Sequence, residues 1–179
     1  VSSVSVAAWI NVGALAAERR VVSNHNNSNG GYKLTLHSTN VPEFEVRTTA
    51  NGATVNRNVA GGTVVVANTW YHLVGVYDRG KAIRTYVNGK LDRDMPTTNL
   101  AGVSNAIFRI GRESHTAANW WYGKLDDVRV YNKALTEADI QKVMQGDTLL
   151  AWNPQPKPGA VVDIQNAATL SWEIGRAHV

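Results

Sequence analysis

The stretch of sequence that decides the fold is WYHLVGVYDRGKAIRTYVNGK, residues 70–90. Its first part, residues 70–77, reads as one long strand that ends in the turn Asp78-Arg79-Gly80. Apolar and polar side chains then alternate over residues 83–87, which is the two-residue period of a half-buried strand. Asn88-Gly89 predicts a type I′ hairpin turn, because both central residues of that turn need a positive φ. The stretch therefore predicts antiparallel strands joined by tight turns.

Strands of the same kind are expected on both sides of this stretch. They cover residues 4–10, 20–23, 32–36, 43–47, 107–111 and 125–131, and Asn51-Gly52 gives a second hairpin signal. Turn signals recur about every 8–12 residues, and strands do not alternate with helices, so the pattern predicts an all-β, two-sheet antiparallel β-sandwich. One segment has the marks of a short C-terminal helix. Thr136 and Asp139 have capping-box spacing there, and Ile140, Val143 and Met144 share one face.

The composition of the sequence changes after Gly146. Proline occupies every second position from Pro154 to Pro158, so residues 149–160 are expected to form an extended linker. Residues 161–172 look like the opening strands of a second β-sandwich, which leaves residues 1–148 as the first domain. Residues 174–179, IGRAHV, correspond to the translation of a common sequencing adapter, ATC GGA AGA GCA CAC GTC. Our hypothesis is that residues 173–179 are an artefact of such an adapter.

Five motifs follow one another in a characteristic order. They are SVAAWI (5–10), WYHLVGVYD (70–78), YVNGK (86–90), FRIG (108–111) and GKLDDVRVYNKALT (123–136). Together they resemble the laminin-G-like domains of the concanavalin A-like lectin/glucanase superfamily, and the resemblance implies a two-sheet jelly roll. The family pattern has one or two strands before the first motif, so a first strand is expected to be missing and one sheet edge to be unpaired. Residues 153–172 resemble, over a shorter stretch, the start of an immunoglobulin-like or fibronectin-type module.

Composition excludes several classes of protein. The chain has no Cys, which excludes thiol catalysis, disulfides and thiolate metal sites and is compatible with export. Its net charge is +4, but Lys and Arg occur singly rather than in runs, so no nucleic-acid partner is expected. No apolar run approaches the roughly 20 residues of a membrane-spanning helix, so no membrane span is expected.

The sequence also lacks the acidic pattern of a glycosidase. Retaining glycosidases of the jelly-roll kind place their carboxylates as E-x-D-x-x-E on one strand, and no such spacing occurs here. Glu43 and Glu45 are the nearest pair, and they are expected to belong to a solvated face opposite Phe44 and Val46. The sequence shows neither a Ser-His-Asp arrangement nor a Cys/His cluster. We therefore expect a noncatalytic domain.

Asp126 is the candidate metal ligand. Related sandwiches hold a calcium ion with an Asp at this position, so the resemblance implies calcium as a cofactor. By period-two alternation Asp126 is in phase with Val128 and Val130, which are expected to face the core. A carboxylate on that side needs a partner, which could be calcium, a backbone N–H or an Arg side chain.

The segment ending in Trp120-Trp121-Tyr122 supplies the candidate ligand site. Tyr122 matches a core aromatic of the family, whereas adjacent strand residues point to opposite sides, so one indole is expected to face outward. Such an indole beside Asn119 and His115 suits a sugar, because the ring covers the C–H face and polar groups bond the hydroxyls. Packing at the rim between the sheets explains the indoles equally well.

These expectations together favour a carbohydrate- or matrix-binding module of a larger secreted or cell-surface bacterial protein. Its partner would be a glycan or a surface protein, and the location extracellular. The first alternative is a structural or adhesion spacer without a sugar site, and the second is a glycosidase domain whose catalytic strand is not recognisable.

Overall fold

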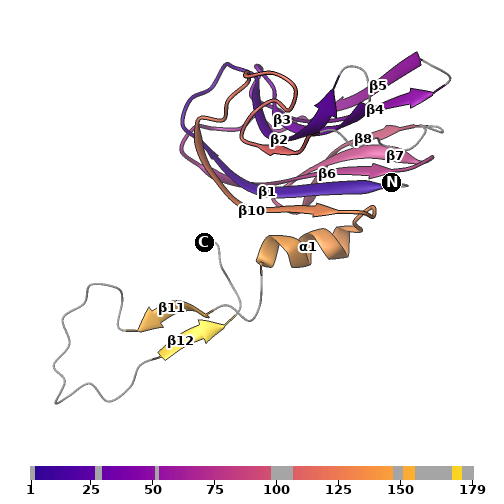
Figure 1. Cartoon of the computed structure of the whole chain (residues 1–179). Coiled ribbons are helices and arrows are strands. Elements are labelled where there is room, and N and C mark those ends of the chain that lie inside the picture. The colour runs from indigo at the N-terminus through magenta and orange to yellow at the C-terminus, as the bar shows by residue number, and fades with distance from the viewer. Residues whose placement is uncertain are drawn as a thin grey trace, which may run out of the picture. The chain divides into compact units, whose positions relative to one another are not determined.

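The fold is a sandwich of two five-stranded antiparallel sheets, ordered β10-β1-β6-β7-β8 and β5-β4-β3-β2-β9 (Figure 1). It is seen in a computed structural model that describes residues 3–26, 30–50, 53–97, 107–146, 151–155 and 171–174. The elements are β1 (Val4–Val12), β2 (Arg19–Asn26), β3 (Gly30–Leu36), β4 (Pro42–Ala50), β5 (Ala53–Ala60), β6 (Trp70–Asp78), β7 (Ala82–Val87), β8 (Lys90–Pro96), β9 (Arg109–Ile110), β10 (Gly123–Tyr131), α1 (Glu137–Gln145), β11 (Ala151–Gln155) and β12 (Ser171–Ile174). The predicted all-β sandwich with one short helix is confirmed.

The hairpin predicted at residues 70–90 forms as expected. β6, β7 and β8 pair in sequence order, and Val87 lies opposite Lys90, which leaves two residues for the turn. Those residues, Asn88 and Gly89, have φ angles of 48° and 75°, as a type I′ turn requires. The second predicted turn, Asn51-Gly52, lies outside the described residues, although β4 and β5 pair up to the residues that flank it.

The apolar core lies between the two sheets. Val6, Ile10 and Leu73 enter it from one sheet, and Leu34 and Phe44 enter it from the other; all five are fully buried. These positions alternate along their strands as the sequence predicts. Burial of the apolar face of each sheet is therefore what joins the two layers.

The first strand is buried on both faces. β1 lies between β10 and β6, and the Ser5 hydroxyl on its outer face donates to the Lys133 carbonyl at 2.8 Å. The same hydroxyl accepts the Leu135 N–H at 3.0 Å, so the segment after β10 covers this face. β1 is thus an interior strand, and the expectation of a missing strand before it stays a prediction.

The solvated face expected at Glu43 and Glu45 is wrong. Both residues lie on the outer face of β4, as their phase predicts, but they are only 7% and 4% exposed. Glu45 pairs with Lys33 of β3 at 3.0 Å and with Arg47 at 3.2 Å. Cations on the same and the neighbouring strand thus pair with Glu45, and Asn58 of β5 donates a hydrogen bond to Glu43 at 3.2 Å, so both carboxylates belong to a buried polar layer on the outer face of this sheet.

The helix begins with the predicted capping box. Thr136 Oγ1 accepts the N–H of Asp139 at 3.1 Å, and Asp139 Oδ2 accepts the N–H of Thr136 at 3.1 Å. The two bonds satisfy backbone donors that a helix start leaves free. Ile140, the first apolar residue of the predicted face, is fully buried. Among the described residues, no helix is long and apolar enough to cross a membrane.

The chain divides into two units, residues 1–140 and 141–179. In the second unit β11 and β12 form a two-stranded ladder in which Trp152 lies opposite Glu173. Part of the expected linker 149–160 is thus a paired strand. The ladder tolerates Pro154 because its register skips from Trp152 to Gln155. The segment 156–170, which holds most of the predicted second sandwich, lies outside the described residues, and the adapter hypothesis stays a prediction.

Gly75 lies where a side chain of the facing sheet leaves no room for a Cβ, and this predicts the effect of a single methyl group. A Cβ at Gly75 would overlap the ring of Phe44 on the facing sheet. Gly75→Ala is therefore expected to lower the free energy of unfolding by about 1–3 kcal/mol through overpacking. Urea denaturation measures the change. Gly62→Ala is the matched control, because the nearest atom to a Cβ there is 3.7 Å away. Equal stability of the two variants would contradict the packing argument.

Candidate functional site

The site is built on the loop between β9 and β10, residues 111–122, which we call the 111–122 loop. Its base is closed by the N–H of Trp121, which donates to the Gly111 carbonyl at 2.8 Å. Two further backbone bonds fasten the loop to β2. The Gly111 N–H donates to Val21 and the Arg20 N–H donates to Asn119, both at 3.0 Å. The loop is therefore fixed along the edge of the sheet that β2 and β9 form.

A buried ion pair locks the loop from inside. Arg20 Nε donates to Glu113 Oε2 at 2.7 Å, and both side chains are 4% exposed. The second oxygen of Glu113 accepts the Ser23 hydroxyl at 2.6 Å and the Ser114 N–H at 2.9 Å. Burial alone would raise the pKa of Glu113, but contacts with His25, Ser23, Ser114 and Arg20 outweigh it and hold the pKa well below its usual range. Glu113 is therefore a carboxylate that anchors the loop.

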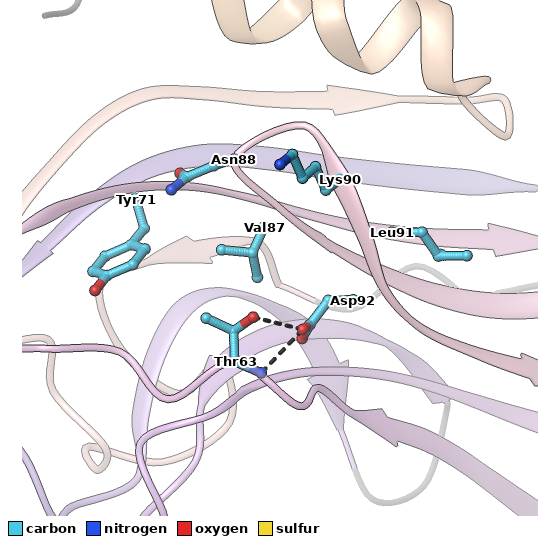
Figure 2. A pocket seen from close by; sticks show the side chains of 7 residues that line it. All are labelled: Thr63, Tyr71, Val87, Asn88, Lys90, Leu91 and Asp92. Carbon is cyan, nitrogen blue, oxygen red and sulfur yellow. Dashed lines mark hydrogen bonds between the residues drawn. The ribbon is translucent and has the colours of Figure 1, made fainter.

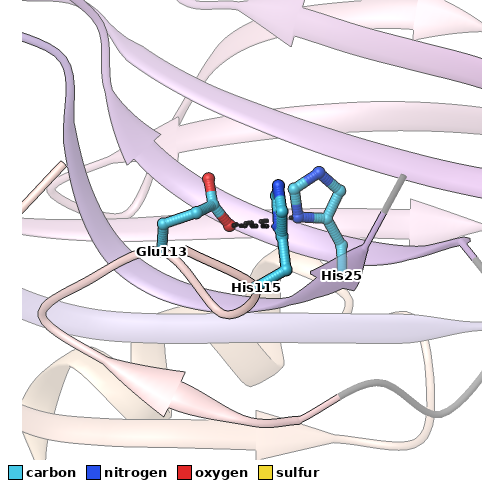
Figure 3. A group of neighbouring side chains, drawn as sticks. All are labelled: His25, Glu113 and His115. Carbon is cyan, nitrogen blue, oxygen red and sulfur yellow. Dashed lines mark ion pairs between the residues drawn. The ribbon is translucent and has the colours of Figure 1, made fainter. Parts of the chain in front are cut away.

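Two histidines converge on the same carboxylate (Figure 3). Nδ1 of His25, on β2, lies 3.2 Å from Glu113 Oε1, and Nδ1 of His115 lies 3.5 Å from the same oxygen. The two rings meet edge to face with centroids 5.1 Å apart. Within the part of the chain that the structure describes, this is the one group of three His or acidic residues whose donor atoms lie within 4.8 Å of one another. Sequence analysis missed it, because its members come from β2 and from a loop some 90 residues later.

The end of the loop presents aromatic rings outward. Trp120 is 53% exposed, whereas Trp121 packs against the core and its Nε1 donates to the Lys124 carbonyl at 3.2 Å. One indole thus faces outward, as expected. The expectation that Tyr122 is a core residue is wrong, because its side chain is 61% exposed. Tyr122 directly precedes β10, which is an edge strand of its sheet.

Two arginines lie close to these rings, and neither was predicted from the sequence. The Arg112 guanidinium lies over the Trp120 ring, 4.8 Å from its centroid, and that of Arg19 lies 5.7 Å from the centroid of Tyr122. Arg19 also donates to the Trp120 carbonyl at 3.0 Å. Arg112 belongs to the same loop as Trp120, whereas no spacing in the sequence reveals the contact of Arg19, which precedes Trp120 by 101 positions. The result is an exposed surface of Trp120, Tyr122, Arg19 and Arg112, which we call the aromatic–arginine surface.

The four residues predicted to bind a ligand fall into different surroundings. Trp120 is exposed, and Asn119 beside it is half-buried and has a positive φ of 53°. Trp121 faces the core, and the His115 ring approaches Glu113 and His25. The structure therefore keeps Trp120 and Asn119 as surface candidates and separates Trp121 from them.

Asp126 does not lie on the core side of β10, so that expectation is wrong. Leu125 and Val128 are the residues of β10 that pack against the core, whereas Asp126 is exposed and lies opposite Trp9. The register between β1 and β10 shifts in this region, and Asp127 has a φ of 46°. This bulge adds one residue between Leu125 and Val128 and so reverses the alternation. Asp126 Oδ1 accepts the Asp127 N–H at 2.7 Å.

A separate pocket of about 380 Å³ lies beside the Asn88-Gly89 turn (Figure 2). It is lined by Thr63, Tyr71, Val87, Asn88, Lys90, Leu91 and Asp92. Asp92 accepts the N–H and the hydroxyl of Thr63, at 3.0 and 2.6 Å, so its carboxylate shapes one wall. Asn88 is likewise engaged, because its Oδ1 accepts the His72 N–H at 2.8 Å. The pocket combines a ring, aliphatic side chains and a Lys, and sequence analysis did not identify it.

Comparison with known proteins gives a family for the chain. Residues 1–141 match the profile of Laminin_G_3, the concanavalin A-like lectin/glucanases superfamily. A search of curated proteins gave no match.

Solved structures give the same fold. A candidate carbohydrate-binding protein from Bacteroides ovatus is 22% identical with a TM-score of 0.59, over 78% of this chain and 40% of that protein. The CBM40 domain of a Ruminococcus gnavus sialidase, bound to α2,3-sialyllactose, is 16% identical with a TM-score of 0.63, over 80% and 83%. The binding domain of Paraclostridial Mosquitocidal Protein 1 is 19% identical with a TM-score of 0.60, over 83% and 39%. The chain thus spans well under half of the first and third of these proteins.

The buried ion pair predicts a large loss of stability when its cation is removed. Arg20→Met keeps the length of the side chain but leaves the Glu113 carboxylate buried without its charged partner. We expect the free energy of unfolding to fall by about 3–5 kcal/mol, measured by urea denaturation. Lys81→Ala is the control, because Lys81 is 74% exposed and pairs with Asp78 at 3.4 Å. That variant should change stability by less than about 1 kcal/mol. A similarly small effect of Arg20→Met would refute the anchoring role.

Proposed function

The chain belongs to the concanavalin A-like lectin/glucanases superfamily, and we propose that it is a noncatalytic carbohydrate-binding module. The observation that carries the proposal is the outward-facing Trp120, 53% exposed on a loop that is anchored to β2. An indole held in one orientation can cover the apolar face of a sugar ring without a further loss of side-chain entropy. The structural neighbours are binding domains, which agrees with a binding role.

The aromatic–arginine surface supplies the polar part of such a site. Arg112 lies over Trp120, and Arg19 is tied to the Trp120 carbonyl and lies near the Tyr122 ring. Guanidinium groups donate several hydrogen bonds in a fixed plane, so they suit sugar hydroxyls or a sugar carboxylate. The site would thus combine stacking on Trp120 with hydrogen bonds from the arginines.

The state of the buried acids supports a noncatalytic role. Glycosidase chemistry needs two carboxylates that flank a substrate, one of which can give up a proton. Glu45 is instead paired with Lys33 and Arg47, and Glu43 Oε2 accepts a bond from Asn58 at 3.2 Å. These contacts hold both groups in the sheet.

Calcium at Asp126 stays a prediction and has no part in this proposal. Calcium takes six to eight oxygen ligands. Asp126 offers one exposed carboxylate, and the neighbouring Asp127 is paired with Arg129 at 2.5 Å. An extracellular or cell-surface location fits a glycan ligand and is proposed with it.

Binding of sugars to single-residue variants tests the proposal. On a glycan array and in affinity gels, Trp120→Ala should weaken binding of any recognised glycan by at least about tenfold, since burial of the ring contributes about 1.5–3 kcal/mol. Lys90→Ala, in the pocket beside the Asn88-Gly89 turn, should bind like the wild type. Circular dichroism checks that both variants are folded.

Two other results would contradict the proposed site or the proposed function. If Lys90→Ala weakens binding and Trp120→Ala does not, the sugar site is the pocket and the aromatic–arginine surface is excluded. If the wild type binds no glycan at all, the carbohydrate-binding proposal fails and the adhesion spacer is favoured.

A further inference from the structure

We propose that His25, Glu113 and His115 form a zinc-binding site that fastens the 111–122 loop to β2. The site is separate from the aromatic–arginine surface, and it requires no sugar. Two imidazole nitrogens and one carboxylate oxygen are a common ligand set for zinc, with the fourth position left to water or another ligand.

The distances suit this ligand set (Figure 3). The His25 and His115 Nδ1 atoms lie 3.2 and 3.5 Å from Glu113 Oε1. Zinc binds such atoms at about 2.0–2.2 Å, so ligand atoms in a tetrahedral site are about 3.3 Å apart. The three donor atoms lie within 4.8 Å of one another, so a small rotation of the partly exposed His115 completes the set.

Hydrogen bonding alone does not account for the cluster. Glu113 Oε1 accepts the Ser23 hydroxyl and the Ser114 N–H, so an ion bound to this oxygen would take the place of the Ser23 hydroxyl. His25 is 2% exposed, and its Nδ1 makes no well-aligned hydrogen bond, although it lies 3.2 Å from the carboxylate and helps to lower the pKa of Glu113. A buried nitrogen of this kind calls for an explanation, and a cation between it and Glu113 would bind its lone pair. The Ser23 hydroxyl would then turn toward another acceptor.

The surroundings orient two of the three ligands. Arg20 holds Glu113 Oε2 at 2.7 Å, which directs Oε1 toward the histidines. Glu45 Oε1 lies 3.9 Å from Nε2 of His25, the ring nitrogen that points away from the site. At this distance the carboxylate does not hydrogen-bond the ring, but its charge favours a proton on the distal nitrogen, which leaves the other nitrogen available to the ion. His115 is partly exposed, so an ion can enter from solvent on its side.

Metal titration of the whole chain tests the site. After dialysis against a chelator, the chain is titrated with ZnCl₂ by calorimetry and with CoCl₂ by visible absorption, which reports tetrahedral coordination. We expect one equivalent of either ion to bind, and zinc to raise the melting temperature. His115→Ala should weaken zinc binding by at least about tenfold and abolish the rise in melting temperature. His37→Ala, at a histidine in the turn between β3 and β4, is the matched control and should bind like the wild type.

The variant is chosen so that a loss of metal binding can be distinguished from a folding defect. His115 is a better target than Glu113, because Glu113 also anchors the loop, and His115→Gln repeats the test if the Ala variant is poorly folded. No binding of zinc or cobalt by the wild type would overturn the proposal and leave the cluster as a hydrogen-bonded anchor. Equal affinity of wild type and His115→Ala would place any bound metal elsewhere. Neither outcome bears on glycan binding, which is measured in the presence of chelator.

Discussion

The ion pair between Arg20 and Glu113 is the interaction on which the position of the 111–122 loop, and of the aromatic–arginine surface that it carries, depends. The two residues are 93 positions apart, yet both are almost completely buried. A charge taken out of water must be paired and hydrogen-bonded, so the loss of either residue would leave the charge of the other buried without its partner. The 111–122 loop is therefore held by this ion pair together with its backbone hydrogen bonds to β2, whereas the two sheets are joined by apolar packing around Phe44 and Gly75.

This division explains which features could be predicted from the sequence. The strands follow from alternation, the Asn88-Gly89 turn from the φ angles that it needs, and the start of α1 from the mutual bonds of Thr136 and Asp139. Each of these signals is local, because all the groups involved lie within a few residues. The resemblance to laminin-G-like domains then orders the local pieces into a jelly roll.

The features that could not be predicted depend on distant residues or on a shift of register. Glu45 is buried because Lys33 of the neighbouring strand reaches it, and alternation carries no information on that contact. Asp126 leaves its expected phase because of the bulge at Asp127. The cluster of His25, Glu113 and His115 and the contact of Arg19 with Trp120 form only when the loop returns to β2. The sequence therefore predicts Trp120 as an exposed residue but not the residues that lie around it.

The closure of the 111–122 loop has a consequence for how such domains diversify. The bond that closes its base joins the backbone of Gly111 and Trp121, so it makes no demand on the side chains between them. Only Glu113, with its neighbour Ser114, is committed to the interior. Residues 116–118 can therefore vary freely while the frame stays unchanged, as the hypervariable loops of antibodies do on their own β-sandwich. The same property makes this segment a natural place to graft or randomise a short sequence in an engineered binder.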